Sequence, residues 1–152
     1  MRTLFLRSSL FAIVTLLVGC GYRVDHGSVP AKLDYLERQF DVKWPTNYYH
    51  AYGGSLTGDR GLCDVVVKLE VSAEALEVWR STATNTLREY GLPATLRDDK
   101  LENYFKWWDW RRYSQKQTVW FANDPKHPNG SLHIFLVQTN QGFAMYIHGT
   151  LR

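Results

Sequence analysis

Cysteine is scarce in this 152-residue chain, and neither sign of charge is in large excess. Two cysteines are too few for a small disulfide-rich protein. A formal charge of +3 is too small for the basic stripe of a nucleic-acid-binding protein, so no nucleic acid is expected as a partner. Hydrophobic residues make up 45% of the chain, which excludes an intrinsically disordered protein. Length and composition together predict one ordinary folded domain, since domains usually contain about 100–150 residues.

A hydrophobic run long enough to span a bilayer is also lacking. The apolar stretch 10–18 is interrupted by one threonine, and as a helix it would rise only about 14 Å, roughly half the hydrocarbon core. Arg2 and Arg7 precede it, and no acidic residue occurs before Asp25. A basic start, a short apolar run and a small residue at Gly19 are the parts of a secretory signal peptide in their usual order.

The apolar run ends in Leu17-Val18-Gly19-Cys20. This segment resembles the lipobox of bacterial lipoproteins, in which Leu, a small or β-branched residue, and Gly or Ala precede Cys. The resemblance implies a diacylglycerol joined to Cys20 by a thioether, cleavage between Gly19 and Cys20, and acylation of the new amino terminus by a chain such as palmitate. Several acyl chains give stable anchoring, because each buried CH₂ contributes about 0.8 kcal/mol and one chain alone is marginal. We therefore predict a lipid-anchored protein of the bacterial cell envelope.

The lipobox resemblance also bears on the choice of membrane. The second residue of the mature chain would be Gly21. In enteric lipoproteins an Asp at this position favours retention in the inner membrane. The resemblance therefore favours the outer membrane in an organism that has two.

Processing would divide the chain into a signal peptide over 1–19, a lipidated tether over 20–27 and a single domain over 28–152. The loss of the two arginines in the signal peptide would lower the formal charge to about +1. With lipid on Cys20, Cys63 is the remaining thiol, so no intramolecular disulfide is expected. Cys63 shares a strand face with apolar residues, which predicts a small buried thiol rather than a nucleophile.

Hydrophobic periodicity predicts both helices and strands in the domain. Residues 28–40 and 72–90 repeat apolar side chains at helical spacing, and residues 98–113 could add a shorter helix. Alternating apolar residues predict strands at 63–71, 118–122, 132–138 and 143–151. This order predicts an α+β fold, an antiparallel sheet of about four to five strands with one long and one or two shorter helices packed on one face.

The order of these segments is similar to that of small bacterial envelope proteins with a Pro-x-x-Tyr segment, an Asp-headed hydrophobic strand, a helix and then a Trp-Trp pair. The corresponding segments are Pro45–Tyr48, Asp64–Val71, Ala73–Tyr90 and Trp107-Trp108. This loose resemblance supports the fold and implies no activity.

The most unusual stretch is 104–113, where six of ten residues are aromatic and three are basic. So many aromatic side chains cannot all point inward from one helix or strand. In one interpretation Trp107, Trp110 and Arg111 form an exposed contact surface for a partner. In the other, Phe105 and Trp108 belong to the core, with Trp107 or Trp110 packed at its edge.

Two of the five histidines would become neighbours if the last hairpin turns at Asn140-Gln141. Thr139 would then face Gly142, and His133 would face His148. A pair about 5 Å apart could bind a metal with a third ligand or respond to pH, although an ordinary half-exposed sheet face is the simpler interpretation. The sequence shows no metal-ligand spacing, no catalytic motif and no phosphate-binding glycine pattern, so neither metal nor cofactor is assigned.

These observations favour a lipid-anchored envelope protein whose domain binds a protein or cell-wall partner without catalysis. The alternative is a small envelope enzyme or metal-binding protein that uses His133 and His148.

Overall fold

The computed structural model describes residues 22–58, 61, 63–83, 87–90, 100–110, 117–123 and 130–151. The expected signal peptide, the lipobox with Cys20, and Arg111 lie outside these residues.

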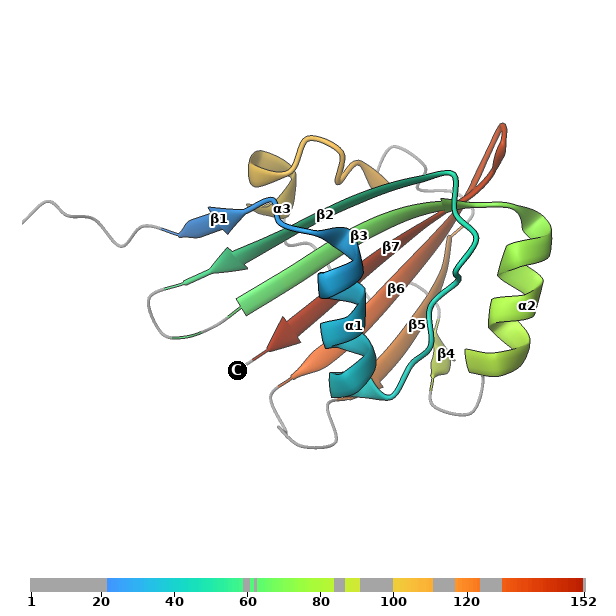
Figure 1. Ribbon diagram of the computed structural model, residues 1–152, viewed down its shortest axis with the longest axis horizontal. Coiled ribbons are helices and arrows are strands. Elements are labelled where there is room, and N and C mark those ends of the chain that lie inside the picture. The colour runs from blue at the N-terminus through green and yellow to red at the C-terminus, as the bar shows by residue number, and fades with distance from the viewer. Residues whose placement is uncertain are drawn as a thin grey trace, which may run out of the picture.

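The described residues form one antiparallel sheet with helices on both faces (Figure 1). In chain order the elements are β1 (Arg23–Asp25), α1 (Val29–Phe40), β2 (His50–Thr57), β3 (Cys63–Val71), α2 (Ala73–Ala83), β4 (Arg88–Tyr90), α3 (Lys100–Tyr104), β5 (Gln117–Asn123), β6 (Ser131–Thr139) and β7 (Gly142–Leu151). The strand order is β1-β2-β3-β7-β6-β5-β4, and all six neighbouring pairs within the described part are antiparallel. The predicted α+β class is confirmed. The five long strands match the expected number, whereas the two three-residue edge strands were not predicted.

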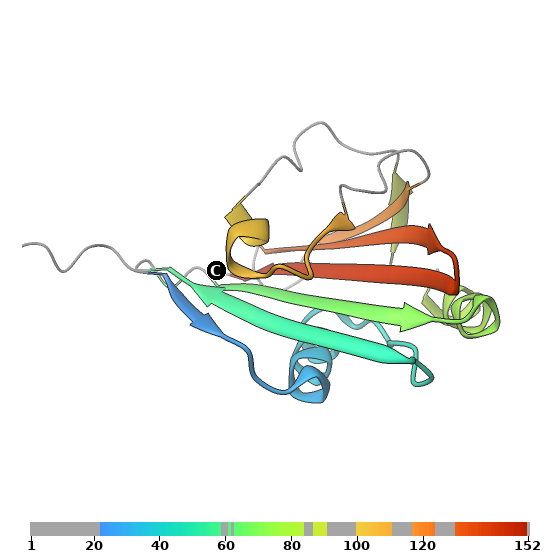
Figure 2. The ribbon, with the colours of Figure 1, turned by 90° about the horizontal axis from the view of Figure 1, so that it is seen from above.

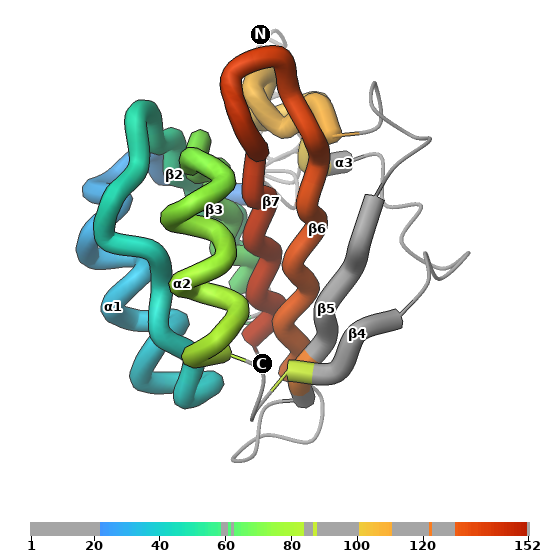
Figure 3. The backbone as a smooth tube through the Cα atoms, turned by 90° about the vertical axis from the view of Figure 1, so that its right-hand side faces the viewer, coloured from blue at the N-terminus to red at the C-terminus, as the bar shows by residue number. Residues whose placement is uncertain are grey.

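Two hydrophobic cores lie on opposite faces of the sheet. The first core packs α1 and α2 against one face through side chains such as Leu36, Trp79 and Val67. The second core places α3 and residues 105–110 against the other face, where Val66 of β3 is also fully buried. Figures 2 and 3 show α1 and α2 on one side of the sheet and α3 on the other. The expectation that the helices share one face is therefore wrong, because β3 buries apolar side chains on both of its faces.

The first helix follows the sequence prediction and buries Leu33, Leu36 and Phe40. The second begins as predicted, since the backbone N–H of Ala75 donates to the Ser72 hydroxyl at 3.1 Å. It ends at Ala83 rather than continuing to Tyr90, and Arg88–Tyr90 instead pairs with β5. The correction has a local reason, because Ser, Thr and Asn crowd positions 81–86 and these residues are poor helix formers.

The segment that was expected to be a tether contains β1. Arg23–Asp25 pairs with Ser55–Thr57, and the Asp25 carboxylate accepts a hydrogen bond from Lys32 Nζ at 2.9 Å. Residues of the predicted tether are therefore already packed against the sheet. This brings the packed part of the chain to within three residues of Cys20.

Candidate functional site

The second face of the sheet, defined here as the face covered by α3 and residues 105–110, carries most of the polar side chains that alternate with the first core. The β2–β3, β3–β7 and β6–β7 registers place Tyr52, Lys68, Tyr146 and Phe135 in one row across four strands. The next row contains Gly54, Val66, His148 and His133. Because side chains alternate along each strand, the two rows point to the same side.

The aromatic residues 105–110 lie directly over these rows. Phe105 sits on Gly54, at which a Cβ atom would lie only 2.2 Å from the ring, so the glycine makes room for it. Trp108 meets the Tyr146 ring edge to face, with centroids 5.5 Å apart, and is 2% exposed. This confirms the interpretation that Phe105 and Trp108 belong to the core.

The three predicted contact residues have different outcomes. Trp110 stacks on Phe135 with centroids 4.6 Å apart and keeps only 9% exposure, so it offers little surface to a partner. Trp107 is half-buried and stacks on Tyr52 at 5.9 Å. Arg111 is not among the described residues.

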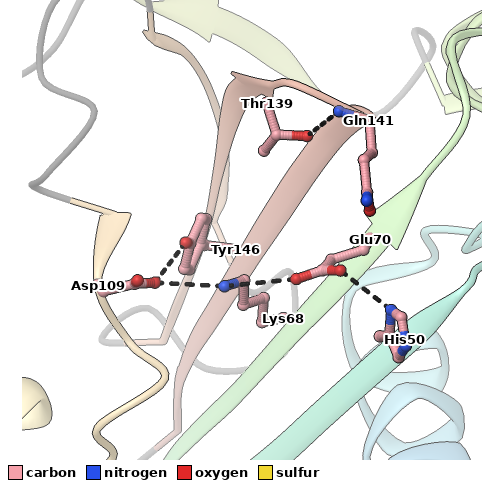
Figure 4. Close-up of polar contacts among 7 residues, drawn as sticks. All are labelled: His50, Lys68, Glu70, Asp109, Thr139, Gln141 and Tyr146. Carbon is pink, nitrogen blue, oxygen red and sulfur yellow. Dashed lines mark hydrogen bonds and ion pairs between the residues drawn. The ribbon is translucent and has the colours of Figure 1, made fainter.

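A chain of ionic and hydrogen-bonded contacts crosses this face, here named the Lys68 network (Figure 4). Its members are His50, Lys68, Glu70, Asp109 and Tyr146. Lys68 Nζ lies 3.3 Å from Asp109 Oδ1 and 3.6 Å from Glu70 Oε1. The Tyr146 hydroxyl donates to Asp109 Oδ1 at 2.6 Å, and His50 Nδ1 lies 3.2 Å from Glu70 Oε2. The network leads from an exposed imidazole to a fully buried phenol.

The electrostatics of the network indicate that Asp109 fastens the aromatic segment to the sheet. Burial acts to raise the pKa of Asp109, but the hydrogen bond from Tyr146 and the charge of Lys68 outweigh it, so the pKa lies below its usual value. Lys68 is 8% exposed, and a buried ammonium group needs such a partner. Because Lys68 and Glu70 are two positions apart in a strand, alternation puts their side chains on one face. The sequence carried no signal for their contact with Asp109, because 41 residues separate Asp109 from Lys68.

The histidine pair lies one row away, where the hairpin register confirms the prediction. Thr139 pairs with Gly142 and His133 pairs with His148, with ring centroids 6.2 Å apart. His148 Nε2 lies 2.8 Å from Asp64 Oδ1, and the two side chains are 12% and 29% exposed. Burial, with a smaller effect from His148, lowers the pKa of His133 from 6.5 to about 4, which keeps this imidazole neutral at pH 7.

The surroundings of the pair give little support to metal binding. Within the described ranges, no group of three or more His, Cys, Asp or Glu side chains could hold a metal ion. Cys63 lies elsewhere, half-buried at the margin of the first core, where the Thr57 hydroxyl donates to its sulfur at 3.8 Å.

Two exposed tyrosines lie at the start of β2, and the sequence analysis did not predict their exposure. Tyr49 is 64% exposed, and Tyr52 is 39% exposed even though Trp107 stacks on it. We name Tyr52 and Trp107 the aromatic edge; Tyr49 lies three positions before Tyr52, so strand alternation does not put the two tyrosine rings on one face. In the described part of the chain, β1 borders β2 only at Ser55–Thr57, so His50–Gly54 has no strand on its outer side.

A cavity of about 230 Å³ lies between residues 44–47 and α2, with Trp44, Asn47, Glu74 and Trp79 in its lining. It is smaller than the roughly 300–1,000 Å³ of typical small-molecule sites. Its single titratable lining group, Glu74, is exposed. The cavity therefore gives no chemical indication of a ligand.

Comparison with known proteins found no matching protein-family model and no significantly similar curated protein or solved structure. Among the described helices, none combines the length and the apolar character needed to cross a membrane.

Proposed function

We propose that this protein is a lipid-anchored component of the bacterial envelope, with the outer membrane favoured, and that its domain binds a protein or cell-wall partner. The observation that carries the anchor is the segment Leu17-Val18-Gly19-Cys20 at the end of a short apolar run that follows Arg2 and Arg7. Cleavage before Cys20 would remove the segment that precedes the domain and leave the sheet intact.

The aromatic edge is the surface that best suits a partner. Tyr52 exposes a large amphipathic ring that stacks on Trp107; such rings combine an apolar body with a polar group and are enriched at protein interfaces. The outer side of His50–Gly54 could also receive main-chain hydrogen bonds from an extended segment, as in strand addition. Compared with the surface expected from the sequence, this surface keeps Trp107, includes Tyr52 in place of Trp110, and does not include Arg111.

The binding proposal is tested with the full-length protein in its native membrane. Tagged wild-type protein is cross-linked and its partners are identified by mass spectrometry, while binding to isolated cell wall is followed by co-sedimentation. We expect Tyr52→Ala with Trp107→Ala to lower partner recovery at least tenfold. The matched control is Tyr35→Ala, which removes a 44% exposed tyrosine from α1.

Thermal unfolding of each variant first shows whether it remains folded, so that a loss of binding can be distinguished from unfolding. Equal recovery of every partner by wild type and the double variant would contradict the binding surface. The single variant Tyr52→Ser, which removes the Tyr52 ring but keeps the contacts of Trp107 with Phe105 and Trp108, guards against a loss caused by unfolding.

A further inference from the structure

We propose that the domain rests on the lipid headgroup layer through one defined end, here named the seating surface, which consists of Tyr22, Arg23, Tyr104 and Lys106. This inference rests on the proposed lipid anchor at Cys20 and deepens it by giving the anchored domain a fixed orientation.

The link between Cys20 and the packed part of the domain is short. Two Cα–Cα steps of 3.8 Å join Cys20 to Tyr22, so the two residues lie at most about 8 Å apart. The Tyr22 ring packs edge to face on Tyr104 of α3, with centroids 5.8 Å apart, and Arg23 starts β1. Only Gly21 therefore separates the lipidated residue from the first packed side chain.

The link from Cys20 to Tyr22 is no longer than the headgroup layer is thick. The polar headgroup region is roughly 5–8 Å thick on each side of a bilayer. A thioether-linked diacylglycerol holds Cys20 at this level. Tyr22 and Tyr104 must then lie in the headgroup layer or directly on it.

The chemistry of the seating surface suits this position. Tyr22 is 46% exposed and Tyr104 is half-buried, and tyrosine is enriched where the hydrocarbon meets the headgroups. Arg23 and Lys106 are exposed cations, and cations at this level are attracted to anionic lipid headgroups. The nearby Asp25 carboxylate is already paired with Lys32.

The register of the strands shows which end of the sheet would face the membrane. Arg23 pairs with Thr57, Thr57 with Cys63 and Cys63 with Leu151, so these residues mark the anchored end of the sheet. The β6–β7 turn lies at the opposite end (Figure 1). Since β7 extends by about 3.3 Å per residue, its turn should stand roughly 30 Å from the headgroups.

The experiment compares the depth of the two ends in the lipidated full-length protein. A fluorophore is attached to Asn103→Cys on α3 or to Gln141→Cys in the turn, both exposed positions, in a Cys63→Ser background. The protein is reconstituted into phosphatidylcholine–phosphatidylglycerol vesicles that contain a headgroup-labelled quencher lipid. We expect at least threefold stronger quenching at position 103 than at position 141.

The cause of the orientation is tested with Tyr22→Ala and Lys106→Gln together, which should reduce quenching at position 103 at least twofold. Tyr35→Ala is the matched control and should leave it unchanged. Equal quenching at the two ends, or no effect of the double variant, overturns the seating surface. Flotation with the vesicles reports the anchor separately: protein that floats with equal quenching contradicts only the orientation, and protein that does not float contradicts the anchor and the orientation together.

Discussion

The half-buried imidazole of His133 should make the stability of the domain depend on pH in a defined window. Burial lowers the pKa of His133 to about 4 in the folded protein, whereas an unfolded histidine titrates near 6.5. Between these two pH values the unfolded state binds more protons. The contribution of His133 is therefore fully present above pH 6.5 and is lost as the pH falls towards 4.

The magnitude follows from the same two values. One pKa unit corresponds to about 1.4 kcal/mol, so the complete loss by pH 4 is about 3 kcal/mol and the loss between pH 7.5 and pH 5 is about 2 kcal/mol. His133→Gln, which cannot be protonated in this range, should remove this part of the pH dependence. Urea unfolding followed by tryptophan fluorescence at the two pH values measures the difference.

A matched control separates the proton effect from lost packing. Ile134→Val lies on the same strand with its side chain in the first core, and it should lower the free energy of unfolding by about 1 kcal/mol at both pH values alike. If His133→Gln shows the same pH dependence as wild type, within the error of the two extrapolations, the assigned role of His133 is refuted.

Three further variants test the packing of the second face. Trp108→Ala should lower the free energy of unfolding by about 3–5 kcal/mol because Trp108 is 2% exposed. Trp107→Ala, at a half-buried position, should lower it clearly less. Similar urea midpoints for the two variants would contradict this prediction. Gly54→Ala should cost about 1–3 kcal/mol because its Cβ would meet a ring at 2.2 Å, whereas Gly53→Ala, with nearest contacts of 3.0 Å, should unfold near the wild-type melting temperature. Asp109→Asn should destabilise by about 2 kcal/mol at pH 7; because the pKa of Asp109 is lowered, this difference should shrink as the pH falls through that pKa, and a constant difference in urea titrations would speak against the ion pair.

Local pattern was enough to predict the long elements of this fold. The alternation in 63–71 and the turn residues Asn140-Gln141 specify a strand and a hairpin register, which is why the opposition of His133 and His148 could be predicted. The Ser72 cap of α2 has a similarly local cause.

Contacts made over long sequence separations could not be predicted in this way. The poor helix formers at 81–86 favour an end of α2 near Ala83, but they carry no signal that Arg88–Tyr90 pairs with β5, a strand about thirty positions later in the chain. The three residues of β1 are too few for a periodic signal, and their pairing partner lies more than thirty positions later in the chain.

The environment of the aromatic residues 104–110 could likewise be predicted only in part. The composition of this stretch predicted that some rings belong to the core and others are exposed, but which rings are buried depends on the residue that lies opposite each ring on the sheet. Gly54 admits Phe105, and Phe135 receives Trp110. The exposure of Tyr49 and Tyr52 depends on which distant segments cover the two faces of β2, and residues 46–52 carry no signal for this.

The lipid on Cys20 is the central claim, since both the envelope location and the seating surface depend on it. Mass spectrometry of the amino-terminal peptide from protein isolated in its native membrane tests it most directly. We predict a chain that begins at Cys20 and carries a thioether-linked diacylglycerol, and a Cys20→Ser variant that keeps residues 1–19 and takes up no fatty-acid label. A wild-type chain with an unmodified Cys20 thiol would contradict the account.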